Sequence, residues 1–127
     1  MDTKFKILIV DDDPINVKMM VHMLSEEYDL ITAPNGKEAL SQVKKHKPDL
    51  ILMDVMMPVM GGFDASILIK SYGSFKHIPI IFITATEGQE GKLFAMELRE
   101  FDYLTKPVNS TQLKQLVSER LATKEPQ

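Results

Sequence analysis

The feature that most constrains the fold of this chain is a series of short apolar runs separated by segments with helical patterns. Residues 7–10, 50–53 and 78–83 are almost continuously apolar, and weaker runs cover 28–32 and 103–104. Strands that are buried on both faces have this composition, and they belong to parallel sheets that helices cover on both sides. Strands that alternate with helices form βαβ units with right-handed crossovers. The sequence therefore predicts an α/β domain with a five-stranded parallel sheet.

Five helical segments are expected between and after these runs. They are opened by Asp13-Pro14, by Asn35-Gly36, by Gly61-Gly62, near Thr86 and by Asn109-Ser110. Aspartate and asparagine are typical N-caps, and proline is favoured at the first helical position. The fourth helix is expected over about 86–99, and the polar tail at 123–127 is expected to fray. Because no linker, repeat or low-complexity segment interrupts the pattern, residues 1–127 are predicted to form a single domain.

Composition excludes several classes of protein. The chain has 127 residues and a formal net charge of −3, so nothing indicates a general binder of nucleic acid or anionic membranes. It contains no cysteine, which excludes disulfides, thiolate chemistry and cysteine metal sites. No apolar run approaches the roughly 20 residues of a membrane span, and the run at 7–10 is too short for a signal-peptide core. A cytoplasmic protein is therefore expected.

Residues suited to chemistry follow four of the five apolar runs. They are the acidic triplet Asp11-Asp12-Asp13, the single acid Asp54, the hydroxyl residue Thr84 and the ammonium residue Lys106. Parallel strands end at the same edge of a sheet, and open α/β sheets bind ligands beyond the carboxyl ends of their strands. We therefore expect several carboxylates, a hydroxyl and an ammonium to converge at one edge.

This set of groups suits a divalent cation and a phosphoryl group. Clustered acids repel one another, and Mg²⁺ prefers carboxylate and carbonyl oxygens. A carboxylate beside the cation can act as a nucleophile and form an acyl phosphate, whose charge the metal, Lys106 and Thr84 would meet. Each residue alone has a simple structural explanation, and Asp13 is expected mainly to cap its helix. Their joint placement at four strand ends favours a functional site.

Four blocks of the sequence resemble the receiver domain of two-component response regulators. They are ILIVDDDP from residue 7, LILMDVMMPVMGGF from residue 50, IIFITA from residue 80 and DYLTKPV from residue 102. The resemblance covers about residues 5–122. It implies a flavodoxin-like, doubly wound fold with strand order 2-1-3-4-5 and five helices. It also implies phosphorelay signal transduction by a switch that phosphorylates itself and slowly loses the phosphoryl group, with no turnover of an external metabolite.

The resemblance implies roles for the residues of the expected site. Asp54 would accept a phosphoryl group from the phosphohistidine of a sensor histidine kinase or a phosphotransfer protein. Lys106 would pair with the phosphoryl oxygens, and the peptide bond between Lys106 and Pro107 would be cis, which X–Pro bonds tolerate at little cost.

The metal site implied by the resemblance takes ligands from two loops. Asp12, Asp54 and the backbone carbonyl of Met56 would bind Mg²⁺, with Mn²⁺ as the alternative metal. Asp11 would contribute directly or through a water molecule. Because few protein ligands are offered, the ion would keep several waters.

The switch and the output surface are also implied by the resemblance. Thr84 and Tyr103 would be the switch pair, with the Thr84 hydroxyl drawn toward the phosphoryl group. The output surface is expected on the fourth helix and the strand after it, where Phe94 and Leu98 lie four residues apart. With Tyr103 they would form a patch for a protein partner, an output domain or a phosphorylation-dependent dimer. Neither direct nucleic-acid binding nor membrane binding is expected.

Three other functions were weighed against this interpretation. A Mg²⁺-dependent phosphohydrolase with an aspartyl nucleophile would need a second acid shortly after the nucleophile, and the segment Asp54-Val55-Met56 has none. A flavin or nucleotide site would need a glycine-rich first turn, and the turn here is acidic. A binding module that works without phosphorylation would not require Asp54, Thr84 and Lys106 together.

Overall fold

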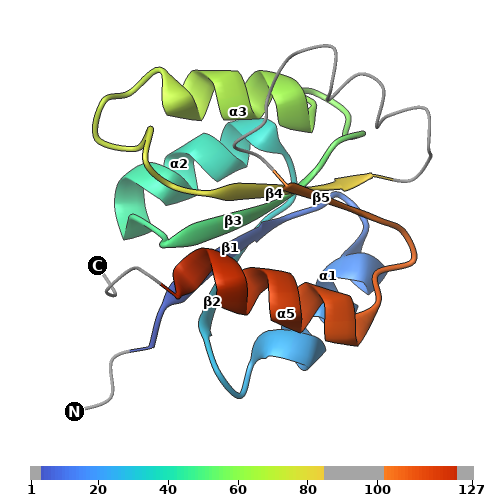
Figure 1. Ribbon diagram of the computed structural model, residues 1–127. Coiled ribbons are helices and arrows are strands. Elements are labelled where there is room, and N and C mark those ends of the chain that lie inside the picture. Colours follow the sequence, from blue (N-terminus) through green and yellow to red (C-terminus); the bar gives the residue numbers. More distant parts are fainter. Residues whose placement is uncertain (1–3, 85–101, 123–127) are drawn as a thin grey trace.

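In the computed structural model, which describes residues 4–84 and 102–122, five parallel strands form one sheet (Figure 1). The strands are β1 (Lys6–Val10), β2 (Asp29–Ala33), β3 (Leu50–Asp54), β4 (Ile80–Thr84) and β5 (Asp102–Thr105). Their spatial order is β2-β1-β3-β4-β5, and every neighbouring pair is parallel. The predicted parallel sheet and the strand order implied by the resemblance are therefore confirmed.

The described part of the chain contains four helices. They are α1 (Pro14–Leu24), α2 (Gly36–His46), α3 (Gly62–Lys70) and α5 (Ser110–Leu121). The remaining expected helix, over about 86–99, lies outside the described residues together with Phe94, Leu98 and the tail at 123–127. Among the described helices, none has the length and apolar character needed to cross a membrane.

Side chains cap three of these helices, as the sequence predicts. Asp13 Oδ1 accepts a hydrogen bond from the Ile15 backbone N–H at 2.9 Å, and Pro14 stands at the start of α1. Asn35 and Asn109 accept in the same way from N–H groups in the first turns of α2 and α5. Each cap of this kind stabilises a protein by about 1 kcal/mol. The expected capping role of Asp13 is thus confirmed.

The sheet separates two layers of helices. α1 and α5 cover one face, and α2 and α3 cover the other (Figure 1). In β3, Leu50 and Leu52 belong to the core on the α1 and α5 side, whereas Ile51 and Met53 belong to the core on the α2 and α3 side. All four are fully buried. Each such side chain contributes roughly 1.5–3 kcal/mol by burial, which explains why the strands are continuously apolar.

The predicted start of the fourth strand is wrong. β4 begins at Ile80, later than the apolar run from residue 78 predicts. Ile78 is buried, but it lies in the preceding loop, where its carbonyl accepts a hydrogen bond from the Lys70 ammonium. Pro79 has no N–H to add to the ladder, so the strand starts after it.

Candidate functional site

The carboxyl ends of the strands meet at one edge of the sheet, and the candidate site lies there. Asp11 directly follows β1, and Asp54 and Thr84 are the last residues of β3 and β4. Lys106 directly follows β5, and its backbone N–H donates to the Thr84 carbonyl at 2.8 Å. The fold therefore brings to one edge the acids, the hydroxyl residue and the ammonium residue that the sequence singled out.

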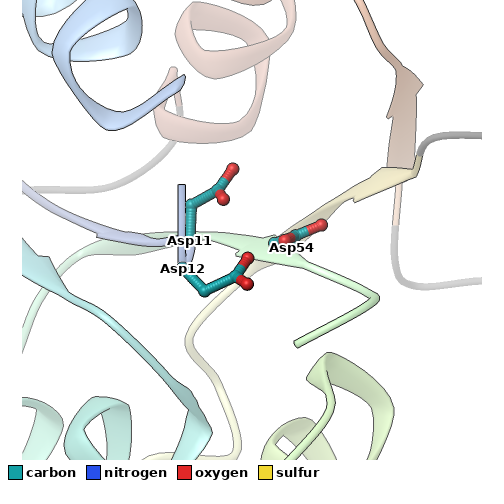
Figure 2. Close-up of side chains that lie close together, drawn as sticks. All are labelled: Asp11, Asp12 and Asp54. Atoms are coloured by element: carbon teal, nitrogen blue, oxygen red, sulfur yellow. The ribbon is translucent and has the colours of Figure 1, made fainter. Parts of the chain in front are cut away.

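Three carboxylates form the centre of this edge (Figure 2). One oxygen atom from each of Asp11, Asp12 and Asp54 lies within 4.8 Å of the other two. Asp11 and Asp54 are each only 2% exposed, whereas Asp12 is exposed. Figure 2 shows the Asp12 side chain pointing toward Asp54, while Asp11 points to the side of the sheet that α1 and α5 cover. The cluster therefore combines two buried acids with one that solvent reaches.

The Lys106 ammonium is shared between two of these acids. Its Nζ atom lies 3.2 Å from Oδ1 of Asp54 and 3.6 Å from Oδ2 of Asp11. The Lys106 side chain is 23% exposed, so solvent reaches it. The peptide bond between Lys106 and Pro107 is cis, as the resemblance implies. Lys106 is thus held beside a carboxylate oxygen of Asp54, the residue that the resemblance implies as phosphoacceptor.

Burial and neighbouring charges shift the pKa values of Asp54 and Lys106. The pKa of Asp54 is raised to about 6, chiefly by burial and then by the charge of Asp11, although Lys106 opposes the shift. Burial lowers the pKa of Lys106, but the charges of Asp54 and Asp11 outweigh this effect and raise it. Three carboxyl groups share one ammonium, so the site has an excess of negative charge that a divalent cation would offset.

The remaining oxygen atoms suit a hard divalent cation. Among the described residues, the buried Oδ2 of Asp54 has no hydrogen-bond partner. Asp11 Oδ1 accepts from the Asp13 backbone N–H at 2.9 Å, and Asp11 Oδ2 faces Lys106. Mg²⁺ prefers oxygen ligands and usually keeps several waters, so one or two carboxylates suffice for it. The donor set therefore fits Mg²⁺, with Asp12 and Asp54 as the carboxylates of the cluster that accept no backbone hydrogen bond from the described residues.

The start of α3 packs directly on the backbone of Asp54. A Cβ atom on Gly62 would lie 2.2 Å from the Asp54 carbonyl oxygen and 2.9 Å from Cγ of Met53. The Gly62 N–H also donates to the Val55 carbonyl at 3.0 Å. Only glycine fits this contact, which fixes the position of Asp54. The sequence analysis took Gly61 and Gly62 as a helix start and missed this role, although their fixed distance from Asp54 was a usable signal.

The loop between β3 and α3 contains a strained turn. The Met60 N–H donates to the Pro58 carbonyl at 2.9 Å, and Val59 between them has a φ of 75°. This is a γ-turn of the rare hand, and positive φ is unfavourable for a β-branched residue. Val59 and Met56 are exposed, at 83% and 62%. The metal-binding role expected for the Met56 carbonyl stays a prediction.

The two residues of the expected switch pair lie on neighbouring strands. Tyr103 of β5 pairs with Phe82 of β4, and Thr84 follows Phe82 by two positions. Side chains two positions apart on a strand share a face, so Thr84 and Tyr103 both lie on the α2 and α3 side of the sheet. Thr84 is buried, and Tyr103 is half-buried against the core of that side. Their movement on phosphorylation stays a prediction.

Comparison with known proteins places this arrangement in a family. The family model described as the response regulator receiver domain matches residues 7–118. Response regulator PleD of Caulobacter vibrioides is 38% identical over 109 residues, which are 85% of this chain and 24% of PleD. Protein PilH of Pseudomonas aeruginosa is 32% identical over 118 residues, which cover 92% of this chain and 98% of PilH.

A solved structure supports the same assignment. The receiver domain of sensor histidine kinase PA1611 from Pseudomonas aeruginosa superposes with a TM-score of 0.85 at 27% identity. The match covers 95% of this chain and 100% of that domain, which was crystallised with a magnesium ion coordinated in its active-site cleft. The chain spans about a quarter of the length of PleD, but nearly all of PilH. It belongs to the receiver domain family of two-component response regulators.

Proposed function

We propose that Asp54 accepts a phosphoryl group in a Mg²⁺-dependent reaction and that residues 1–127 act as one phosphorylation-controlled switch. The observation that carries this proposal is the position of Asp54, a buried carboxylate 3.2 Å from Lys106 and within a cluster of three acids. The donor is the phosphohistidine of a sensor histidine kinase or of a phosphotransfer protein. The PA1611 domain, itself part of a sensor kinase, supports this kind of partner and this metal.

The chemistry assigned to Asp54 is a displacement at phosphorus. A carboxylate oxygen of Asp54 attacks the phosphorus atom, the P–N bond to the donor histidine breaks, and the imidazole leaves. Burial and the Asp11 charge raise the pKa of Asp54 to about 6, so the nucleophile is ionised at neutral pH yet more basic than an ordinary aspartate. The Lys106 ammonium pairs with the oxygen atoms of the transferred phosphoryl group and offsets their negative charge. Water later hydrolyses the acyl phosphate and resets the switch.

The metal ligands assigned to this chain are Asp12, Asp54 and the Met56 carbonyl, with Asp11 acting through water. Asp11 is assigned the indirect role because its two oxygens already face the Asp13 N–H and the Lys106 ammonium. When bound, Mg²⁺ or Mn²⁺ supplies positive charge that stabilises the phosphoryl oxygens during transfer.

The output of the switch is assigned to the β5 side of the sheet. The Thr84 hydroxyl moves toward the phosphoryl group, and Tyr103 turns into the space that it leaves. Tyr103 is assigned to the surface that then binds a partner protein, an output domain or a second copy, and Phe94 and Leu98, outside the described residues, are proposed to belong to the same surface. The domain acts in the cytoplasm and turns over no external metabolite.

Phosphorylation of Asp54 is tested with a small donor. Wild-type protein incubated with Mg²⁺ and acetyl phosphate is expected to gain one base-labile phosphoryl group, seen by mass spectrometry of the intact protein. Asp54→Asn should gain none. Asp64→Asn is the matched control, because Asp64 is an exposed acid on α3. An unlabelled wild type, or an adduct that survives in Asp54→Asn, would overturn the proposal.

Metal binding is tested by titration of Mg²⁺ with isothermal calorimetry or tyrosine fluorescence. Asp12→Ala is expected to weaken binding by more than about tenfold, since even residues that merely orient metal ligands are worth that much. Asp13→Asn is the control. It keeps the helix cap and removes the neighbouring charge, so it should bind nearly as the wild type does. Equal loss in both variants would mean that total charge, rather than ligation by Asp12, holds the ion.

A further inference from the structure

A small cavity lies beside the candidate site, between α1 and the segment that follows β5. Its volume is about 80 Å³. The lining is mostly apolar and includes Met19, Met20, Ile83, Pro107 and Val108. Three polar residues also line it, namely Asp11, Asn16 and Lys106. Asp11 and Lys106 belong to the candidate site, whereas Asn16 lies on α1 outside it.

Asp11, which lines this cavity, has a buried oxygen atom without a hydrogen-bond partner among the described residues. The side chain is fully buried, and Oδ2 has no hydrogen-bond partner among the described residues. Its nearest charged neighbour is the Lys106 ammonium at 3.6 Å, beyond normal hydrogen-bond length. Figure 2 shows Asp11 turned toward the α1 and α5 side, which is the side of the cavity. A buried carboxylate oxygen without a hydrogen-bond donor destabilises the folded state, so we expect a further donor to Asp11 Oδ2.

The cavity has the size and the polar groups that a buried water needs. A cavity can hold a water molecule once it offers roughly 10–15 Å³ to a water-sized sphere, and the water requires two to four polar partners. Asp11, Asn16 and Lys106 line the cavity, and their side chains carry a carboxylate, an amide and an ammonium. Asn16 is half-buried and lines the cavity from the α1 side.

We propose that Asn16, with one or two water molecules in this cavity, satisfies Asp11 Oδ2 and thereby positions Lys106 for the phosphoryl group on Asp54. The proposal rests on the function assigned to Asp54 above. A hydrogen-bond donor to Asp11 Oδ2 weakens the attraction between Asp11 and the Lys106 ammonium. Lys106 then stays at the Asp54 oxygen, where its Nζ is closer, at 3.2 Å against 3.6 Å. Asn16 does not contact the reacting atoms, so it is a positioning residue.

The test compares substitutions at two lining residues of the same cavity. Asn16→Leu fills the space with apolar atoms and excludes water, Asn16→Ser restores a polar group, and Met19→Leu changes the lining at nearly constant volume. The rate of Asp54 labelling by acetyl phosphate is measured at saturating Mg²⁺. Acetyl phosphate is used because it labels Asp54 without a kinase. The measured rate therefore contains no contribution from the docking of a kinase on α1. Asn16→Leu is expected to label roughly tenfold more slowly, as is usual for residues that orient a site group. Asn16→Ser and Met19→Leu should stay close to the wild type.

A second measurement does not depend on phosphorylation. In protein with ¹⁵N-labelled lysine, the Lys106 ammonium resonance is expected in the wild type and in Asn16→Ser, because the ammonium protons are held by fixed partners. It should shift or broaden in Asn16→Leu. Equal labelling rates and an unchanged Lys106 resonance in Asn16→Leu would overturn the role of Asn16. Failure of the wild type to label would instead count against the function of Asp54, so the two outcomes are distinguishable.

Discussion

Asp54→Asn is expected to raise the free energy of unfolding by about 3 kcal/mol at pH 8 without divalent cations. The pKa of Asp54 is about 6 in the folded protein, against an ordinary value of 3.8. A raised pKa means that the folded state holds the proton more tightly than the unfolded chain does. The stability that this proton provides is complete below about pH 4 and is lost as pH rises through about 6. Asparagine has nearly the same shape as aspartate but cannot ionise, so Asp54→Asn does not lose this stability as the pH rises.

Urea unfolding of wild type and variant at pH 4 and pH 8 checks this expectation. The gain should be large at pH 8 and close to zero at pH 4. Asp64→Asn, which removes an exposed acid, should show little gain at either pH. Added Mg²⁺ should reduce the difference in the free energy of unfolding between the wild type and Asp54→Asn at pH 8, because it binds the folded wild type and stabilises it by mass action. A gain of equal size at both pH values would show that the buried charge is not its cause.

Gly62→Ala is expected to lower the free energy of unfolding by about 3 kcal/mol, the upper range for forced overpacking. The added Cβ would meet the Asp54 carbonyl oxygen at 2.2 Å, and a backbone atom in a central strand cannot move aside cheaply. The strand end or α3 must therefore shift, and Asp54 shifts with them. Labelling by acetyl phosphate should also slow in the folded fraction, because the carboxylate leaves its place beside Lys106.

Gly73→Ala is the matched control for this substitution. No atom lies within 4 Å of a Cβ built at Gly73, so its effect on stability should stay within about 0.5 kcal/mol. Thermal or urea unfolding gives the stabilities, and labelling at a temperature where both variants are folded gives the rates. If Gly62→Ala matched Gly73→Ala in both measurements, the packing of α3 on Asp54 would not be what fixes the phosphoacceptor.

The sequence predicted the sheet and the edge at which the site lies because both depend on local pattern. Continuous apolar runs mark buried parallel strands, and the residue after each run must lie at the carboxyl edge. The placement of Asp11, Asp54 and Lys106 follows from this rule alone. The strand order and the cis peptide bond came from resemblance to a family, since neither periodicity nor composition specifies them.

Other properties of the site depend on contacts that no local pattern encodes. The raised pKa of Asp54 results chiefly from its burial and then from the charge of Asp11, which directly follows β1. The roles of Gly62 and Asn16 depend on what a helix contacts after it packs on the sheet. The start of β4 was misplaced because Ile78 is buried without being in a strand, and burial alone does not distinguish a strand from a loop that packs.

The division of the core by the sheet has a consequence for how this protein tolerates change. Adjacent residues of β3, such as Ile51 and Leu52, pack into different layers, and the two core clusters have no described residue in common. Substitutions without common contacts usually add in their effects on stability. Side chains within one layer can therefore change size in ways that compensate for one another, while the opposite layer keeps its packing. Sequence drift in one layer leaves the other half of the scaffold beneath the carboxylates intact, so the chemistry can persist while the interior diverges.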